Sequence, residues 1–172
     1  MILPVQPYKE TRAGYCGPAT LKMVLAYYGV DQSEETLAQE LGTTPDAGTP
    51  PEAIVRVAEH YGFKATEKQH STFDDIAYWL NEHVPVIVDW FSSAETQDET
   101  ADGHYSAVVG LDDTYIHLQD PELGRLRRFT RSDFLRVWFD FPKDSIRSSD
   151  ELVLRQLIAI YRQENNPEGE IA

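Results

Sequence analysis

The sequence predicts an α+β domain in which helices come first and an antiparallel sheet follows. Up to residue 83, apolar residues recur at the i, i+3, i+4 and i+7 spacing of amphipathic helices. After residue 83, short runs of β-branched and aromatic residues separated by turn residues replace that spacing, which is typical of strands. The 172 residues contain no internal repeat and no linker, so we expect a single domain over 1–172 with its core over about 4–140.

The first helix has a start and an end that can be recognised in the sequence. Gly17-Pro18 suits its first turn, because proline lacks the N–H group that a helix start leaves unbonded. Gly29 is expected to end it. Cys16 therefore lies at or just before the helix N-terminus. The apolar stripe of this helix consists of Leu21, Val24, Leu25 and Tyr28.

Further helices are predicted from capping patterns, and the sheet from the apolar runs between them. The expected caps are Asp31 with Glu34, Thr49 with Glu52, Ser71 or Thr72, and Ser148 with Glu151. The last of these helices is expected over about 149–163, followed by a frayed polar tail. Strands are expected over 84–91, 105–111 and 115–118, the last two forming a hairpin that turns at Asp112-Asp113, and a short helix near 134–138.

The composition excludes several classes of protein. The formal net charge is -14, whereas nucleic-acid binders need a basic face. The one basic cluster comprises Arg125, Arg127, Arg128 and Arg131. We interpret it as a strand followed by a helix start, with exposed arginines, rather than as an anion-binding site. No apolar run approaches the roughly 20 residues that span a bilayer, and the N-terminus does not resemble a signal peptide, so we expect a cytoplasmic protein without membrane insertion. A lone cysteine excludes an intramolecular disulfide and a multi-cysteine zinc site, and no metal or organic cofactor is indicated.

Cys16 has the surroundings that a nucleophilic cysteine needs. Cysteine attacks as the thiolate, and the helix macrodipole favours negative charge at a helix N-terminus. The backbone N–H groups of a first helical turn are free, so one of them can meet a developing oxyanion. Gly17 leaves room for a substrate beside the thiol. Alone, a single cysteine is more often a buried apolar residue, but these neighbours favour a nucleophile.

Among the five histidines, His104 is the best candidate for the base of Cys16. It begins a strand directly after a glycine and an acidic loop, at a sheet edge where an imidazole can face a cleft. Asp120 ends the partner strand. The hairpin register decides whether the two meet: a two-residue loop pairs His104 with Pro121 and puts Asp120 on the opposite face. A loop of Leu111–Asp113, or a bulge with the same result, puts both side chains on one face, where Asp120 could hold the Nδ1–H group; we expect this second register.

These residues resemble a known family of peptidases. The run from Tyr15 to Gly29, YCGPATLKMVLAYYG, is similar to the nucleophile helix of the bacteriocin-processing, double-glycine-leader peptidases (cysteine peptidase family 39 and its stand-alone relatives). The run from Gly103 to Gly110, GHYSAVVG, resembles that family's histidine strand, and Asp120-Pro121 resembles its aspartate. The resemblance covers about residues 4–140 and implies a papain-like fold, with the nucleophile helix packed on the sheet and with Cys16, His104 and Asp120 as the catalytic triad.

One position departs from the family pattern. Six residues before the cysteine the family has a glutamine whose side-chain N–H helps to form the oxyanion hole, and here that position is Glu10. An ionised carboxylate would repel an oxyanion, and losing one such donor typically costs about 100- to 1000-fold in turnover. Three alternatives follow: Glu10 is protonated by burial, another donor such as Gln6 replaces it, or catalysis is weak or absent.

The sequence thus predicts a thiol hydrolase that cleaves a peptide or isopeptide bond in a peptide or protein substrate. The alternatives are a non-catalytic peptide-binding module, which Glu10 favours, and an acyltransferase that uses the same three residues. No nucleotide-binding motif accompanies the domain, so a transporter would have to be a separate partner. The acidic loop before His104 is either a solvated loop, which is favoured, or a subsite for basic peptides; its acids are Glu95, Asp98, Glu99 and Asp102. Oligomeric state is left open.

Overall fold

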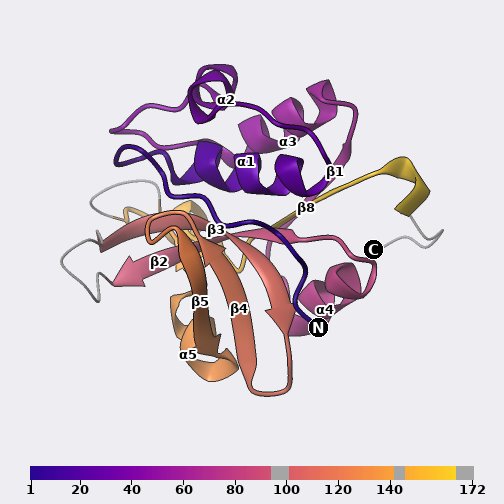
Figure 1. Ribbon diagram of the computed structural model, residues 1–172. Coiled ribbons are helices and arrows are strands. Elements are labelled where there is room, and N and C mark those ends of the chain that lie inside the picture. Colours follow the sequence, from indigo (N-terminus) through magenta and orange to yellow (C-terminus); the bar gives the residue numbers. More distant parts are fainter. Residues whose placement is uncertain (94–100, 142–145, 166–172) are drawn as a thin grey trace.

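The computed structural model describes residues 1–93, 101–141 and 146–165, and over these ranges it has the predicted order of helices followed by an antiparallel sheet (Figure 1). The helices are α1 (Cys16–Tyr27), α2 (Glu34–Leu41), α3 (Pro51–His60), α4 (Phe73–Asn81) and α5 (Arg131–Val137). The strands are β1 (Lys64–Lys68), β2 (Val86–Ser93), β3 (Ala101–Leu111), β4 (Tyr115–Asp120), β5 (Arg125–Thr130), β6 (Phe139–Asp140), β7 (Val153–Leu154) and β8 (Leu157–Tyr161). Two short 3₁₀ turns are η1 (Ser149–Glu151) and η2 (Gln163–Asn165).

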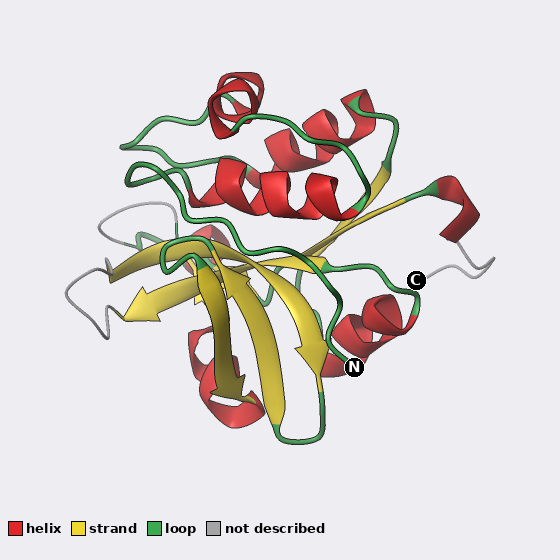
Figure 2. Cartoon of the chain, viewed as in Figure 1, coloured by secondary structure: helices red, strands yellow, loops and turns green. Residues whose placement is uncertain are grey.

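Six strands form one antiparallel sheet in the order β1-β8-β2-β3-β4-β5. Helices α1, α2 and α3 cover one face of this sheet, and α4 and α5 lie on the other side (Figures 1 and 2). Strands β6 and β7 pair separately. Helix α1, which begins at Cys16, is thus packed on the antiparallel sheet, as the fold class predicted from the sequence requires.

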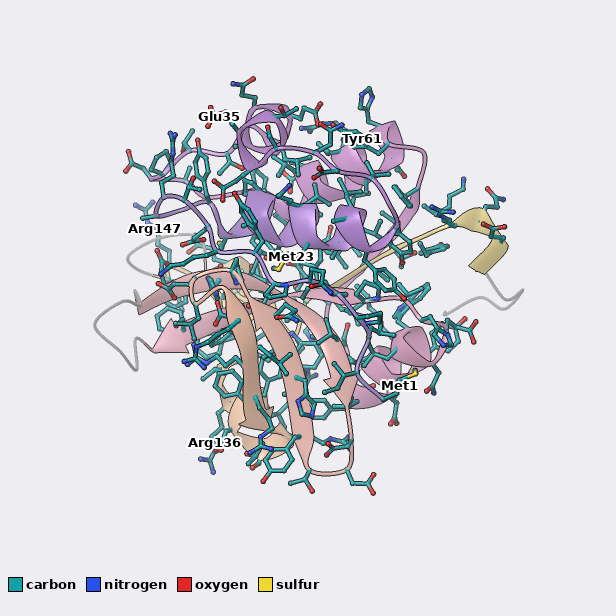
Figure 3. All side chains as sticks on the ribbon, viewed as in Figure 1. Met1, Met23, Glu35, Tyr61, Arg136 and Arg147 are labelled. Carbon is teal, nitrogen blue, oxygen red and sulfur yellow. The ribbon has the colours of Figure 1, made fainter. Side chains whose placement is uncertain are left out.

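Two apolar cores lie on the two faces of the sheet because side chains alternate along each strand. On β2, Val86, Val88 and Trp90 belong to one core and Ile87 to the other. Helix α1 contributes Leu21, Val24 and Leu25 to the second core, whereas its Met23 extends towards the first (Figure 3). Both Trp90 and Trp138 are almost fully buried.

The predicted C-terminal helix over about 149–163 is wrong. Residues 149–151 form only a 3₁₀ turn, and residues 157–161 form β8, which lies between β1 and β2 in the sheet. The apolar residues taken as a helical stripe belong to a strand that is buried on both faces, so all five of its residues are apolar and buried. A continuous apolar run of this kind cannot be assigned to a helix or a strand by spacing alone.

Strand β1 was not predicted, because its sequence KATEK is polar and lies at the edge of the sheet, where one side faces solvent. The caps are partly as expected. Thr72 caps α4 in a capping box with Asp75. Helix α2 is capped by Ser33 rather than by Asp31, and α3 begins after Pro50 without any side-chain cap. The hydroxyl of Thr49 instead bonds that of Thr43 at 2.7 Å.

Within the described ranges, every helix is too short or too polar to cross a bilayer.

Candidate active site

Cys16 is the first residue of α1, as predicted, and its side chain is partly exposed. The N-cap residue Tyr15 makes no side-chain hydrogen bond to the first turn. Pro18 carries no N–H, and the N–H of Ala19 donates to the carbonyl of Tyr15 at 3.0 Å. The N–H groups nearest the thiol therefore belong to Cys16 and Gly17, at the positive end of the helix dipole.

Gly17 is required by close packing against the loop before α3. A Cβ atom at this position would lie 2.3 Å from the Oγ1 atom and 2.6 Å from the Cβ atom of Thr49. These distances are far below van der Waals contact, so either the helix start or Thr49 would have to move. Gly17 thus holds the start of α1, and with it the thiol, against this loop.

We expect Gly17→Ala to lower the free energy of unfolding by about 1–2 kcal/mol, because overpacking forces side chains and backbone apart. Urea denaturation measures the loss. In a Thr49→Gly background the same substitution should cost much less, since both the Oγ1 and the Cβ atoms that clash are gone. An equal loss in both backgrounds would show that the contact with Thr49 is not the cause.

A β-bulge in β3 brings His104 and Asp120 to the same face of the sheet. Near the turn, Gly110 pairs with His117, and beyond the bulge Val108 pairs with Leu118. Val109 is therefore the extra residue, and its carbonyl accepts a hydrogen bond from the N–H of Leu3 at 2.7 Å. Without the bulge the register would put the two side chains on opposite faces. His104 and Asp120 are not directly paired across the hairpin. Instead the bulge, which was the alternative expected from the sequence, puts their side chains on the same face.

The imidazole of His104 lies between Asp120 and Cys16. Its Nε2 atom is 2.8 Å from Oδ1 of Asp120, so the carboxylate holds Nε2 rather than the expected Nδ1. A side-chain hydrogen bond links the imidazole to Cys16. The indole of Trp90 meets the imidazole edge to face at 5.4 Å. Burial disfavours the charged imidazole, but the hydrogen bonds to Asp120 and Cys16 outweigh it, so the pKa of His104 is raised well above its ordinary value.

Asp120 is fixed by two further donors. The backbone N–H of Glu122 donates to Oδ1 at 3.0 Å, and Arg127 donates to Oδ2 at 3.2 Å. Burial raises the pKa of Asp120, but the hydrogen bond and charge of His104, followed by the charge of Arg127, lower it overall. The carboxylate therefore remains charged beside the imidazole.

Arg127 was expected to be an exposed arginine and is instead almost buried, at 9% exposure. Its guanidinium also lies over the rings of Trp90 and Phe129, 5.3 Å and 4.7 Å from their centroids. The alternation of side chains along β5 could have predicted that Arg127 faces inward. Phe129 points inward, so Arg127, two residues earlier, lies on the same face as Asp120 on β4.

Glu10 lies beside these residues in the segment before α1. Its N–H donates to the carbonyl of Pro121 at 2.8 Å, which ties this segment to the end of β4. The next residue is held from α2, because the N–H of Thr11 donates to Oε2 of Glu34 at 3.1 Å. Burial raises the pKa of Glu10 to about 7; His104 opposes the rise, and Glu122, Asp120 and Glu34 add to it.

Two buried carboxyl groups behind His104 were missed by the sequence analysis. Asp89 on β2 is 5% exposed and forms a side-chain hydrogen bond with Asp140 on β6. The carboxyl of Asp140 packs on the Cα of Gly103, where an added Cβ would collide with it. Burial is the main cause that raises the pKa of both groups, and their mutual repulsion adds to it for Asp89. Asp89 therefore resists ionisation, and its protonated carboxyl group can donate a hydrogen bond to Asp140.

The other histidines do not reach the site. His60, His70 and His83 are exposed, and His117 is near Asp112, 3.4 Å away, at the turn of the hairpin. Of the acidic loop, Glu95, Asp98 and Glu99 lie outside the described residues, and Oδ1 of Asp102 accepts from the N–H of Gly103. Within the described part of the chain, no three His, Cys, Asp or Glu side chains are grouped as a metal site would need.

A surface hollow of about 610 Å³ lies away from these residues, next to Val30, Phe63 and Arg162. Val30 follows the C-terminal end of α1, whereas Cys16 is at the opposite end of that helix. The hollow is thus separate from the site around Cys16.

A cysteine at a helix N-terminus beside a buried His–Asp pair on an antiparallel sheet is the arrangement of cysteine peptidases. The Peptidase_C39 like family model matches residues 2–146, so the chain belongs to this family of cysteine-peptidase-like proteins. An uncharacterized protein of Methanothermobacter marburgensis is 34% identical over 116 residues, which are 67% of this chain and 71% of that protein.

The transport/processing ATP-binding protein ComA of Streptococcus pneumoniae is 33% identical over 128 residues. These residues are 72% of this chain but only 16% of ComA. Among solved structures, a double glycine motif protease from an AMS/PCAT transporter, in complex with the leader peptide, superposes with a TM-score of 0.67. The match covers 94% of each chain at 18% identity, and it establishes the likeness of the fold.

Proposed function

We propose that this protein is a cysteine peptidase that cleaves a peptide or isopeptide bond through Cys16, His104 and Asp120. The observation that carries the proposal is the position of the His104 imidazole, which bonds Asp120 through Nε2 and also bonds Cys16. A cysteine, a base within hydrogen-bond reach and a carboxylate that orients the base are the requirements for nucleophilic catalysis by a thiol.

The proposed reaction has two steps. The Cys16 thiolate attacks the carbonyl carbon, the backbone N–H of Cys16 donates to the oxyanion, and the His104 imidazolium gives its proton to the leaving amine. The product is a thioester on Cys16. His104 then takes a proton from water, the hydroxide attacks the thioester, and the free acid and the thiolate are released while the imidazolium is restored. Asp120 orients the imidazole and balances its charge throughout.

We propose a peptide as the substrate, because a relative with the same fold is described in complex with a leader peptide. Transfer of the acyl group to an amine or thiol would use the same three residues and differs only in its product. A peptide-binding module without catalysis is the second candidate, and it is favoured by Glu10, whose charged form would oppose an oxyanion.

We expect iodoacetamide to alkylate Cys16 at pH 6 at least about tenfold faster in the wild type than in His104→Ala, because the imidazolium stabilises the attacking thiolate. Mass spectrometry of the intact protein gives the rate from the single cysteine. His117→Ala is the matched control, since it removes a strand histidine that lies at the hairpin turn, and it should react like the wild type. Equal rates in wild type and His104→Ala would refute the Cys16–His104 pair.

A further inference from the structure

The carboxyl group of Glu10 has no hydrogen-bond partner in the described part of the chain. Its Oε2 atom is buried and makes no hydrogen bond to a described residue. A buried polar atom without a partner costs free energy, so such an atom at a candidate active site calls for an explanation. The Oε2 atom of Glu10 thus has a hydrogen-bonding capacity that no described residue uses and that a bound ligand could use.

The groups that face this carboxyl come from three elements. They are His104 on β3, Asp120 at the end of β4 with Glu122 just after it, and Glu34 at the start of α2. Only His104 carries a positive charge, and it is already engaged by Asp120 and Cys16. Three carboxylates and burial act against a charge on Glu10, so its neutral form, which carries an O–H donor, is favoured at mildly acid pH.

The position of Glu10 suits a donor to the reacting carbonyl. The hydrogen bond from its N–H to the carbonyl of Pro121 fixes its backbone next to Asp120. The Cys16 N–H can supply one hydrogen bond to an oxyanion, and a second donor is needed to complete such a hole. Gln6, the other side chain considered for this role, is exposed.

We propose that the neutral carboxyl group of Glu10 donates the second hydrogen bond to the oxyanion, which makes the enzyme active at acid to neutral pH and switches it off as Glu10 ionises. This inference rests on the proposed function and names the regulation of the same site. The proton stays on Glu10 throughout, so no additional proton transfer enters the reaction. Because the pKa of Glu10 is about 7, the donor should be lost as the pH rises through about 7.

The test compares two reactions of Cys16 in wild type and Glu10→Gln. Acylation by p-nitrophenyl acetate passes through an oxyanion, whereas alkylation by iodoacetamide does not. The acylation rate is divided by the alkylation rate at each pH between 5.5 and 9, which cancels the ionisation of the thiol. We expect this ratio to fall by about 100-fold or more in the wild type as Glu10 ionises, consistent with the loss of one oxyanion donor.

In Glu10→Gln the ratio should stay flat and equal the acid value of the wild type within about threefold, because the amide is a donor at every pH. Glu10→Ala should be low at every pH. Glu35→Gln, an exposed acid on α2, is the control and should keep the wild-type profile. Melting temperatures establish that each variant is folded.

Three results overturn the inference. A wild-type ratio that is independent of pH excludes Glu10 as the donor, as does a Glu10→Gln variant with the same pH-dependent fall as the wild type. An active Glu10→Gln beside a wild type that is inactive at all pH values also overturns it, while supporting the Cys16–His104 pair. If no variant is acylated at any pH although Cys16 is alkylated normally, the proposed peptidase function itself fails.

Discussion

Asp120→Ala should lower the free energy of unfolding by about 3–5 kcal/mol, because it breaks a buried ion pair by removing the carboxylate. The Arg127 guanidinium is 9% exposed, and its ion pair is with Asp120 at 3.2 Å. The imidazole of His104 loses its Nε2 contact at the same time.

The sign of the pH dependence follows from the lowered pKa of Asp120. A carboxyl group with a depressed pKa contributes stability above its unfolded value, near 4, and this contribution is lost as the pH falls through the folded pKa. The difference in the free energy of unfolding between wild type and Asp120→Ala should therefore be largest at neutral pH and smaller at acid pH. Urea denaturation at pH 7 and pH 3.5 measures both.

Two controls separate the charge from the shape. Asp120→Asn keeps the size of the side chain and an acceptor oxygen, so it should destabilise less than Asp120→Ala. Glu35→Ala removes an exposed carboxylate that contacts Arg12 at 3.5 Å, and it should cost less than about 1 kcal/mol. A loss for Asp120→Ala as small as that for Glu35→Ala would contradict the buried ion-pair network.

Asp89→Asn should raise the free energy of unfolding at pH 8 by about 2–3 kcal/mol, since an amide can donate to Asp140 without the cost of burying a second charge. The pKa values of Asp89 and Asp140 are raised, so their contribution to stability is full below about pH 4 and is lost as the pH rises through the folded pKa values. The wild type should thus weaken from pH 5 to pH 8.

The variant should weaken less over this range, so its advantage over the wild type should grow with pH. Asp113→Asn, at an exposed position in the hairpin turn, is the control and should leave the slope unchanged. A variant that is less stable than the wild type at pH 8 would mean that Asp89 is ionised in the native protein and serves another contact.

The N-terminal helices and the residues of the site could be predicted because their signals are local. The glycine and proline at the start of α1, the capping box of α4 and the order of Cys16, His104 and Asp120 can each be seen within a few residues. The alternation along the hairpin strands puts Val108, Ile116 and Leu118 on one face, and all three belong to the same core. These features depend on neighbours in the chain rather than on distant partners.

The remaining features depend on contacts between distant segments. Strand β8 pairs with β1 and β2, about 70 to 100 residues away, and nothing in its own apolar run distinguishes a buried strand from a helix. The hydrogen bond between Asp89 and Asp140 depends on β2 and β6 coming together beside Gly103. Likewise, Nε2 rather than Nδ1 of His104 faces Asp120, because the two residues lie diagonally across the bulged hairpin. No spacing in the sequence specifies this arrangement.

Whether His104 and Asp120 lie on the same face of the sheet depends on whether the number of residues between them, including the bulged Val109, is odd or even. Any change of an even number of residues between the two keeps them on one face, and any odd change separates them. A turn that is lengthened by one residue can therefore be compensated by losing the bulge several residues away. Chains related to this one can differ in their hairpin turns and still bring the same two side chains together, so pairwise alignments of this hairpin should be anchored on the histidine and the aspartate rather than on the turn.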